Sequence, residues 1–254
     1  MTARGEQTRK VAERRHGTTI APRALDVWGW STPAGRLRAQ RRIGLIAAAA
    51  AMGDGTRVLE LGCGTGLFTR GFAAHGARVV ALDISLDLLL QARRGEDVPA
   101  RLVLGDAERL PFRGGCFDAV VGSSVLHHLE PLAALRETHR VLALGGRVAF
   151  AEPNMLNPQI AVQKNVSFIK RAFGDSPDET AFFRWQAEKL LREAGFAQTG
   201  VLPHEFLHPA TPVWLLGFVR GLSALLERVP LLREIGGSLL FWGVRRTPAP
   251  PEGG

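Results

Sequence analysis

Cysteine is scarce in this sequence. Cys63 and Cys116 are the only two cysteines among 254 residues, too few for a disulfide framework. No group of cysteines and histidines has the spacing of a zinc site, so we expect no metal ion. The first residues, MTARGE, lack the apolar core of a signal peptide, and we expect a protein of the reducing cytoplasm.

Long apolar runs are also missing. A membrane-spanning helix needs about 18 apolar residues or more. The nearest candidate, residues 211–244, is interrupted by Arg220, Glu227, Arg228, Pro230, Arg233 and Glu234. The helix that we expect at 212–228 is nonetheless apolar over most of its circumference, which is compatible with peripheral contact with a membrane.

Lysine is rare, although the net charge is +8; nearly all of the 32 basic residues are arginines. Such a charge can attract nucleic acid, an anionic membrane or an acidic substrate. The arginines are scattered and are not interleaved with aromatic residues, so we attribute them to a composition rich in Ala, Arg and Gly. Nucleic acid is therefore not the expected partner.

Strands and helices alternate through the middle of the chain. Apolar runs predict strands at 56–61, 78–82, 101–104, 117–121 and 147–151, and helices between them at 67–75, 85–94 and 131–144. Two more strands are expected at 199–202 and 238–244. This alternation is typical of an α/β fold, with a mostly parallel sheet covered by helices on both faces.

The domain boundaries follow from the same pattern. We expect a flexible tail at 1–18, one domain at 19–245 and a second flexible tail at 246–254. The domain comprises a core at 56–153 and cap elements at 19–52, 154–177 and 205–237. The Ser176-Pro177 pair predicts the start of a helix that continues to residue 194.

A glycine-rich loop follows the first predicted strand. The run Glu60-Leu61-Gly62-Cys63-Gly64-Thr65-Gly66 leads from a buried strand into a helix. Glycines there let the backbone approach a ligand closely, and the helix presents its N–H groups to that ligand. An ordinary turn or a nicotinamide-dinucleotide site would also account for the loop alone.

Three acids narrow the choice of ligand. Asp83 ends the second strand and is placed to bind both hydroxyls of a ribose. Glu60 precedes the loop, where a carboxylate would repel a pyrophosphate but suits a ligand with a cationic end. Asp106 follows the third strand and can accept a hydrogen bond from an adenine amino group.

These motifs resemble those of class I S-adenosylmethionine (SAM)-dependent methyltransferases of the small-molecule type. The resemblance is carried by residues 58–66, 80–83, 105–112, 117–120 and 126–129. It implies a Rossmann-like fold with a seven-stranded, mostly parallel sheet and a small cap, with SAM as cofactor and S-adenosylhomocysteine as product.

The resemblance also implies a role for each matched residue. Glu60, Gly62 and Gly64 would line the methionine end of SAM, and Ser123, after the fourth strand, would lie near its amino acid portion. Cys63 and Gly66 of the same loop would also bind the cofactor. Asp83 would hold the ribose, Ile84 would lie against the adenine, and Asp106 and Ala107 would meet the adenine edge. Asp118 would be structural.

Two histidines, His127 and His128, follow the fourth strand, where the acceptor pocket of this family lies. A hydroxyl acceptor needs a base, and imidazole titrates near neutral pH, so either is a candidate; a structural role is the alternative. His204 and His208 are weaker candidates. The apolar cap favours a small but bulky apolar acceptor, such as a lipid, quinone precursor or other secondary metabolite, with O-methylation favoured over C-methylation.

Other functions stay open at this point. Enzymes of this fold that methylate amino groups of nucleic acids carry (Asp/Asn)-Pro-Pro-(Tyr/Phe) after the fourth strand, where this chain has Gly-Ser-Ser-Val at 122–125. An RNA methyltransferase of another type, or a catalytically inactive SAM-binding protein that acts by interaction, remains an alternative. The sequence does not indicate the oligomeric state.

Overall fold

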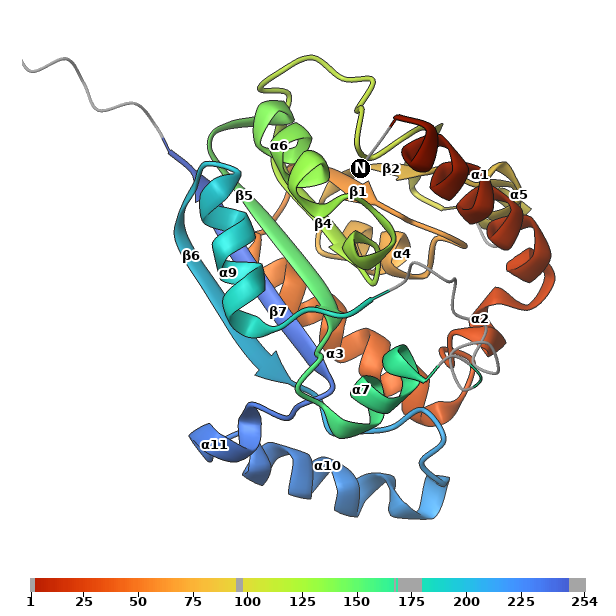
Figure 1. Ribbon diagram of the computed structural model, residues 1–254, viewed down its shortest axis with the longest axis vertical. Coiled ribbons are helices and arrows are strands. Elements are labelled where there is room, and N and C mark those ends of the chain that lie inside the picture. The colour runs from red at the N-terminus through yellow and green to blue at the C-terminus, as the bar shows by residue number, and fades with distance from the viewer. Residues whose placement is uncertain (1–2, 95–97, 167, 169–179, 247–254) are drawn as a thin grey trace, which may run out of the picture.

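A seven-stranded sheet forms the centre of the computed structural model, which describes residues 3–94, 98–166, 168 and 180–246 (Figure 1). The strand order is β3-β2-β1-β4-β5-β7-β6. The strands are β1 (Arg57–Leu61), β2 (Arg78–Asp83), β3 (Ala100–Leu104), β4 (Phe117–Ser123), β5 (Leu142–Pro153), β6 (Phe196–His204) and β7 (Ser238–Arg245). Only β7 runs antiparallel to its neighbours, β5 and β6. The predicted mostly parallel Rossmann-like sheet is confirmed.

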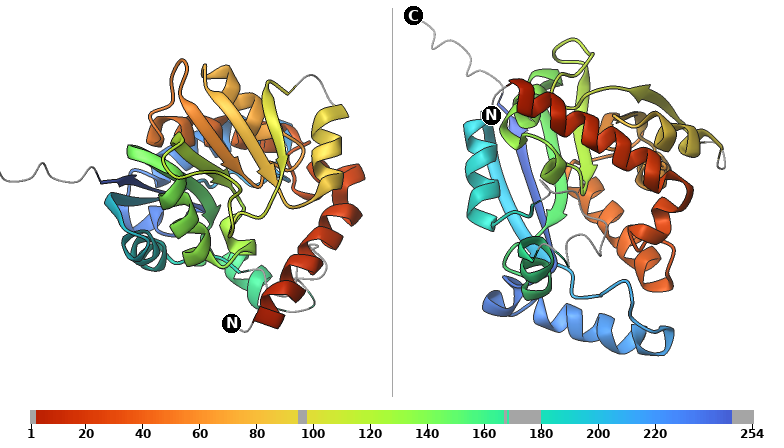
Figure 2. Two further views of the ribbon diagram at one scale, coloured as in Figure 1. Left: turned by 90° about the horizontal axis from the view of Figure 1, so that it is seen from above. Right: turned by 45° about the vertical axis from the view of Figure 1, so that its right-hand side comes forward.

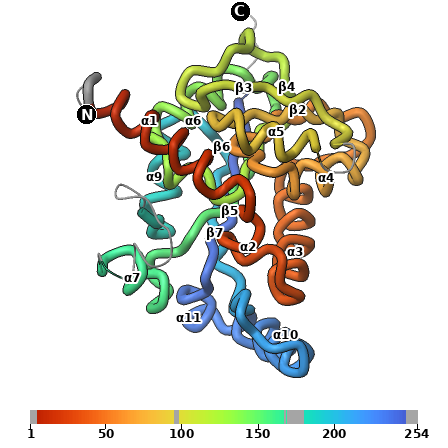
Figure 3. The backbone as a smooth tube through the Cα atoms, turned by 90° about the vertical axis from the view of Figure 1, so that its right-hand side faces the viewer, coloured from red at the N-terminus to blue at the C-terminus, as the bar shows by residue number. Residues whose placement is uncertain are grey.

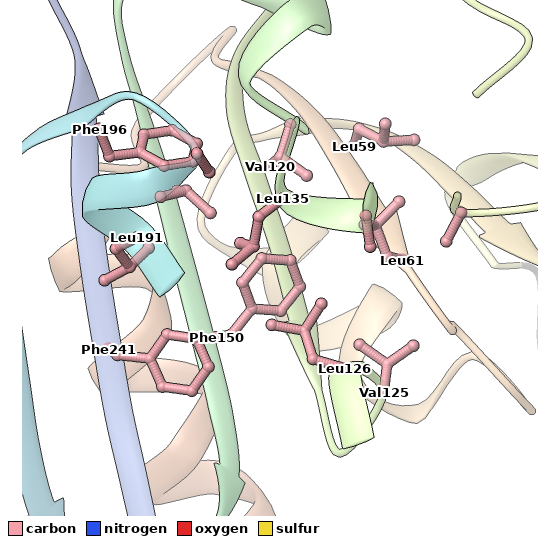
Figure 4. Close-up of a cluster of buried hydrophobic side chains, with 14 of the residues drawn as sticks. Leu59, Leu61, Val120, Val125, Leu126, Leu135, Phe150, Leu191, Phe196 and Phe241 are labelled. Atoms are coloured by element: carbon pink, nitrogen blue, oxygen red, sulfur yellow. The ribbon is translucent and has the colours of Figure 1, made fainter. Parts of the chain in front are cut away.

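Helices cover both faces of the sheet, which explains why its strands are continuous apolar runs. On one face lie α3 (Pro33–Ala49), α4 (Leu67–Ala74) and α5 (Leu86–Arg94). On the other lie η2 (Leu126–His128), α6 (Pro131–Val141) and α9 (Arg184–Glu193). Figure 4 shows the core on this second face, where Phe150 of β5 lies between Leu126 and Phe241. The ring centroids of Phe150 and Phe241 are 6.2 Å apart.

The N-terminal segment differs from the prediction of a flexible tail at 1–18. Residues Ala3–Ile20 form the helix α1, which packs against α5 and continues through η1 (Ala21–Arg23) and α2 (Ala24–Val27) (Figure 2). Arg9 and Lys10 are buried in spite of their charge. They form ion pairs with Glu108 and Asp106, and these long-range contacts cannot be seen in an aperiodic polar sequence.

A second difference concerns residues 180–183, where a helix running from 176 to 194 was expected. The predicted start at Ser176-Pro177 lies outside the described residues. Residues 180–183 are not helical: Phe182 accepts a hydrogen bond from the N–H of Met155 and donates one to the carbonyl of Pro153. This pairing buries Ala181 and Phe182, and the helix α9 begins only at Arg184.

The remaining elements lie at one end of the molecule. α7 (Pro158–Asn165) follows β5. The predicted helix 212–228 consists of η3 (Val213–Leu215) and α10 (Leu216–Leu226), and α11 (Pro230–Arg233) comes after it. In Figures 1 and 3, α10 and α11 lie beyond the sheet, at the end toward which β6 points. Of the predicted tail 246–254, residues 247–254 lie outside the described part.

Candidate functional site

The glycine loop between β1 and α4 has a backbone that only glycine adopts readily. Gly62, Gly64 and Gly66 have φ angles of 66°, 52° and 77°, all in the left-handed region. A Cβ atom at Gly62 would come within 2.4 Å of Val125, and one at Gly64 within 2.9 Å of Trp28. The loop is therefore packed closely between the end of β4 and the N-terminal segment, and Cys63 within it is buried.

Asp83 fixes the geometry at the end of β2. One carboxylate oxygen accepts the N–H of Gly64 at 2.8 Å, and the other accepts the N–H of Ser85 at 2.8 Å. Burial raises the pKa of Asp83 above its usual value. Each carboxylate oxygen has two lone pairs, so the group can still accept hydrogen bonds from two ligand hydroxyls.

Glu60 lies at the end of β1 and is only 2% exposed. The Thr69 hydroxyl donates a hydrogen bond to it at 2.5 Å. Burial raises the pKa of Glu60 to about 8, so the carboxyl group is largely protonated at neutral pH. A cationic group close by would favour its charged form.

A cavity of about 440 Å³ lies between the ends of β2 and β3 and the helix α1. Of the predicted cofactor residues, Ile84 and Asp106 line it. The other predicted residues are not part of this lining: Glu60, Gly62, Cys63, Gly64, Gly66, Asp83, Ala107 and Ser123. A volume of this size is sufficient for part of a nucleoside ligand. Ala107, beside Asp106, is buried.

The wall that α1 contributes to this cavity was not predicted from the sequence. Arg14 and Thr18 line it, and the Lys10 ammonium lies 2.7 Å from an Asp106 carboxylate oxygen. The other Asp106 oxygen accepts the N–H of Glu108 at 2.8 Å. The spacing of residues 10, 14 and 18 is the four-residue spacing of one helix face, which would have been the sign to look for.

His127 forms a buried pair with a carboxylate that was not among the predicted site residues. Its Nδ1 atom lies 2.6 Å from an oxygen of Glu152, which is fully buried near the end of β5. The other Glu152 oxygen accepts the N–H groups of Val125 and Leu126, each at 2.9 Å. Burial alone would raise the pKa of Glu152, but His127 and the two backbone donors outweigh it and hold the pKa below its usual value.

His128 faces α1. Its Nδ1 atom lies 3.2 Å from a Glu13 oxygen, and its ring centroid is 4.2 Å from that of His127. The Arg9 guanidinium donates a hydrogen bond to the His128 carbonyl at 2.6 Å. The two histidines therefore have different surroundings: His127 contacts Glu152 near the end of β5, and His128 contacts Glu13 of α1.

Ser123 is held by a buried arginine. Arg42 of α3 donates hydrogen bonds to the hydroxyls of Ser123 and Ser124, each at 3.0 Å, and to that of Ser238 at 2.7 Å. Burial, with Arg38 close by, lowers the pKa of Arg42 to about 10. Arg42 thus ties α3 to the ends of β4 and β7.

The other singled-out residues lie elsewhere. Burial lowers the pKa of His204 to about 3, so its imidazole is neutral, and His208 contacts Gln159 of α7 at 2.9 Å. Asp118 pairs with Arg57 and joins β4 to β1 at the start of the strands. Within the described residues, no three His, Cys, Asp or Glu side chains could together hold a metal ion. No helix in that part of the chain is long and apolar enough to cross a membrane.

Comparison with known proteins identifies the family of the chain. A family model described as a methyltransferase domain matches residues 59–150. A demethylmenaquinone methyltransferase of Mycobacterium sp. (strain KMS) is 36% identical over 159 residues, which cover 59% of this chain and 68% of that protein. The biotin biosynthesis bifunctional protein BioHC of Cellvibrio japonicus is 41% identical over 142 residues, 56% of this chain and 27% of that protein.

Two solved structures share the fold. A possible histamine N-methyltransferase of Thermotoga maritima has a TM-score of 0.63 at 19% identity, covering 89% of this chain and 98% of that one. Phosphoethanolamine N-methyltransferase 2 of Haemonchus contortus, in complex with SAM, has a TM-score of 0.61 at 17% identity. The match covers 91% of this chain and 60% of that one.

The sheet order and the glycine loop with its acids define a nucleoside-binding α/β enzyme. More specifically, the chain belongs to the class I SAM-dependent methyltransferases, and SAM is its cofactor. The residues present fit that cofactor: the Asp83 carboxylate has lone pairs left to accept ligand hydroxyls, and Glu60 can become a counter-ion for a cationic ligand.

Proposed function

We propose that this enzyme transfers the methyl group of SAM to a hydroxyl of a small, apolar, lipid-like acceptor. The observation that carries this proposal is the His127–Glu152 pair, which lies beside the glycine loop. Val125 links the two: its side chain packs against Gly62, and its N–H donates to Glu152. The relatives named demethylmenaquinone methyltransferases support an acceptor of lipid-like character.

We further propose how SAM lies in the site. Asp83 binds the ribose, and the cavity lined by Ile84 and Asp106 takes the adenine, with Ala107 at its edge. The methionine end then lies along the glycine loop, toward Glu60 and Ser123. In this arrangement the loop contributes its backbone: Gly62, Gly64 and Gly66 have no side chain, and that of Cys63 is buried.

The cofactor placement is tested by replacing Asp83 with Ala. A hydrogen bond to a charged group contributes about 1.5–3 kcal/mol, so loss of both ribose hydrogen bonds should lower SAM affinity roughly 100-fold or more in calorimetry. Asp118→Ala is the matched control, because Asp118 pairs with Arg57 at the opposite end of the strands. Asp83→Asn keeps one acceptor oxygen and should lose less. Unchanged affinity in folded Asp83→Ala would contradict the placement.

The chemistry of the His127–Glu152 pair suits proton removal. Glu152 accepts the Nδ1–H of His127, which makes Nε2 the basic nitrogen of the ring. SAM supplies an electrophilic methyl group whose C–S bond breaks with its electron pair left on sulfur. As the acceptor oxygen bonds to the methyl carbon, His127 takes the hydroxyl proton. Glu152 acts as a positioning residue, because it fixes the ring and stabilises the imidazolium.

Substitution of His127 by Asn tests this role. General-base catalysis contributes roughly 100- to 10,000-fold, so kcat should fall in that range while SAM affinity is retained. Glu152→Gln should lower kcat less and shift the pH profile, because the imidazolium loses its counter-charge. His75→Asn, at the exposed end of α4, is the control.

The position of the transferred methyl group in the product distinguishes O-methylation from C-methylation. Reaction of a hydroxylated naphthoquinol with SAM carrying a deuterated methyl group should give a product whose label is on oxygen by NMR. A label on a ring carbon would show that the enzyme methylates carbon and would contradict the proposed O-methylation. Full activity of His127→Asn would remove His127 from the proposal.

A further inference from the structure

The C-terminal helices carry a large exposed apolar surface. In α10, Ser223 is the only buried residue. The most exposed apolar side chains are Leu231 at 85%, Trp214 at 81% and Phe218 at 68%. We call the following set the α10–α11 face: Val213, Trp214, Phe218, Leu222, Leu225, Val229, Leu231, Leu232 and Ile235. Large apolar side chains that are exposed together on consecutive helices indicate an interaction site.

The shape of this region favours a flat or deformable partner. In Figures 1 and 3, α10 and α11 form a ridge at one end of the molecule. A ridge can insert into a layer of lipid headgroups, whereas a peptide partner needs a groove. With 11 residues, α10 is about 16 Å long and lies along such a layer without crossing it.

In the part of the chain that the structure describes, the acids around the face are paired, whereas two of its arginines are not. Glu227 is held by Arg41 and also accepts the N–H of Glu205 at 2.9 Å, and Glu234 pairs with Arg184 at 3.1 Å. In contrast, no acid within the described residues forms an ion pair with Arg220 or Arg228, and both are exposed. The charges left available beside the apolar side chains are therefore positive.

We infer that the α10–α11 face docks the enzyme on an anionic lipid surface. Its apolar side chains enter the boundary between headgroups and acyl chains, Arg220 and Arg228 contact lipid phosphates, and Trp214 lies at the headgroup level. Trp214 suits this position because its ring is apolar and its indole N–H is polar.

The location of the face adds a consequence that rests on the proposed function. Ser223 of α10 accepts the N–H of Phe206, two residues after the end of β6, and β6 ends at the same edge of the sheet as β4 and β5. A lipid-like acceptor leaving the bilayer would meet that edge first. Docking itself does not depend on which acceptor is methylated.

Vesicle co-sedimentation of the full chain tests the docking. We expect the protein to bind vesicles of phosphatidylglycerol and phosphatidylcholine, and to bind vesicles of phosphatidylcholine alone roughly tenfold more weakly. The variant Trp214→Glu/Phe218→Glu/Leu231→Glu should weaken binding to the anionic vesicles at least roughly tenfold. Arg220→Glu/Arg228→Glu should abolish the preference for anionic lipid.

The control is Leu144→Glu, which makes the same change from an apolar to an acidic side chain at a residue of β5 that is 54% exposed. It should bind vesicles like the unmodified protein. SAM affinity, measured for every variant, separates this inference from the proposed function, because loss of docking should leave it unchanged.

A second measurement does not depend on a loss of binding. Lipids brominated near the headgroup should quench the fluorescence of the vesicle-bound protein, and Trp214→Phe should remove most of that quenching while the protein still sediments. If wild-type protein fails to sediment with anionic vesicles, the inference is wrong. A dimer that the triple Glu variant disrupts, without vesicle binding, would assign the face to a second copy of the chain instead.

Discussion

Glu60 shows how one buried carboxyl group responds to its surroundings. Its oxygen accepts from Thr69, but no ion pair among the described residues joins it to a cation, so burial determines its behaviour. The folded protein holds a proton there with a pKa of about 8, whereas the usual value is 4.5. Under the proposed placement of SAM, binding would lower this pKa and release the proton.

This difference makes stability depend on pH. Between about pH 5 and pH 8, the unfolded chain has lost the Glu60 proton and the folded protein retains it. The stabilisation is therefore complete below pH 4.5 and is lost as the pH rises through 8. We expect Glu60→Gln to remove roughly 4 kcal/mol of the decline in unfolding free energy over this interval, as measured in urea.

The control for this experiment is Glu193→Gln, which replaces an exposed carboxylate on α9 and should leave the pH dependence as it is. Wild-type and Glu60→Gln protein with parallel pH profiles would show that Glu60 is ionised in the folded enzyme.

Some residues of the candidate site could be predicted from the sequence alone, and others could not. The positions of Asp83, Asp106 and the loop glycines at strand ends could be predicted from their spacing, while their roles toward SAM stay predictions. Glu152 could have been found as the one acid in the apolar run of β5, but its pairing with His127 depends on the neighbouring positions of β4 and β5 in the sheet. The burial of Arg42 could not be predicted from the sequence, because a charged residue in a helix is usually exposed.

Among the elements, α1 is unusual because charge rather than apolar area holds it. Arg9 and Lys10 reach Glu108, and Lys10 also contacts Asp106 and, within α1, Glu6. Burial lowers the pKa of Lys10, but its bonds to the three carboxylates outweigh this and raise the pKa above the usual value. Apolar packing is confined to the end of the helix, around Ile20.

We therefore expect Arg9→Ala/Lys10→Ala to release α1 while the sheet stays folded. Removing the partners of buried carboxylates is destabilising by about 3 kcal/mol, which should speed amide hydrogen exchange in residues 3–20 on the order of 100-fold. Arg15→Ala, at an exposed position of the same helix, should leave exchange unchanged. Equal protection of α1 in all three proteins would show that charge does not hold it.

The elements that the sequence predicted wrongly share one property. The helix α1 and the extended residues 180–183 are both determined by contacts with distant parts of the chain. By contrast, α4, α5 and α6 were predicted closely, because each has an apolar face of its own and follows or precedes a short strand. Local periodicity predicts elements that pack directly on the sheet and fails for those fixed by specific polar or backbone pairing.

At the scale of the whole molecule, the number of strands and the mostly parallel sheet were both predictable. The order in which the last three strands pair could not be predicted from the residues, because it depends on contacts between segments far apart in the chain. In the structure β7 lies between β5 and β6 and pairs with both, so the last strand of the chain enters the sheet between two earlier ones.

This strand order has a consequence for synthesis on the ribosome. The segment that becomes β6 emerges more than 30 residues before Ser238–Arg245, the only strand with which it pairs. Until β7 arrives, β5 presents an open edge and β6 has no sheet to join, and exposed edges of this kind invite association between chains. The edge of β5 is therefore open to association until residues 238–245 have been made.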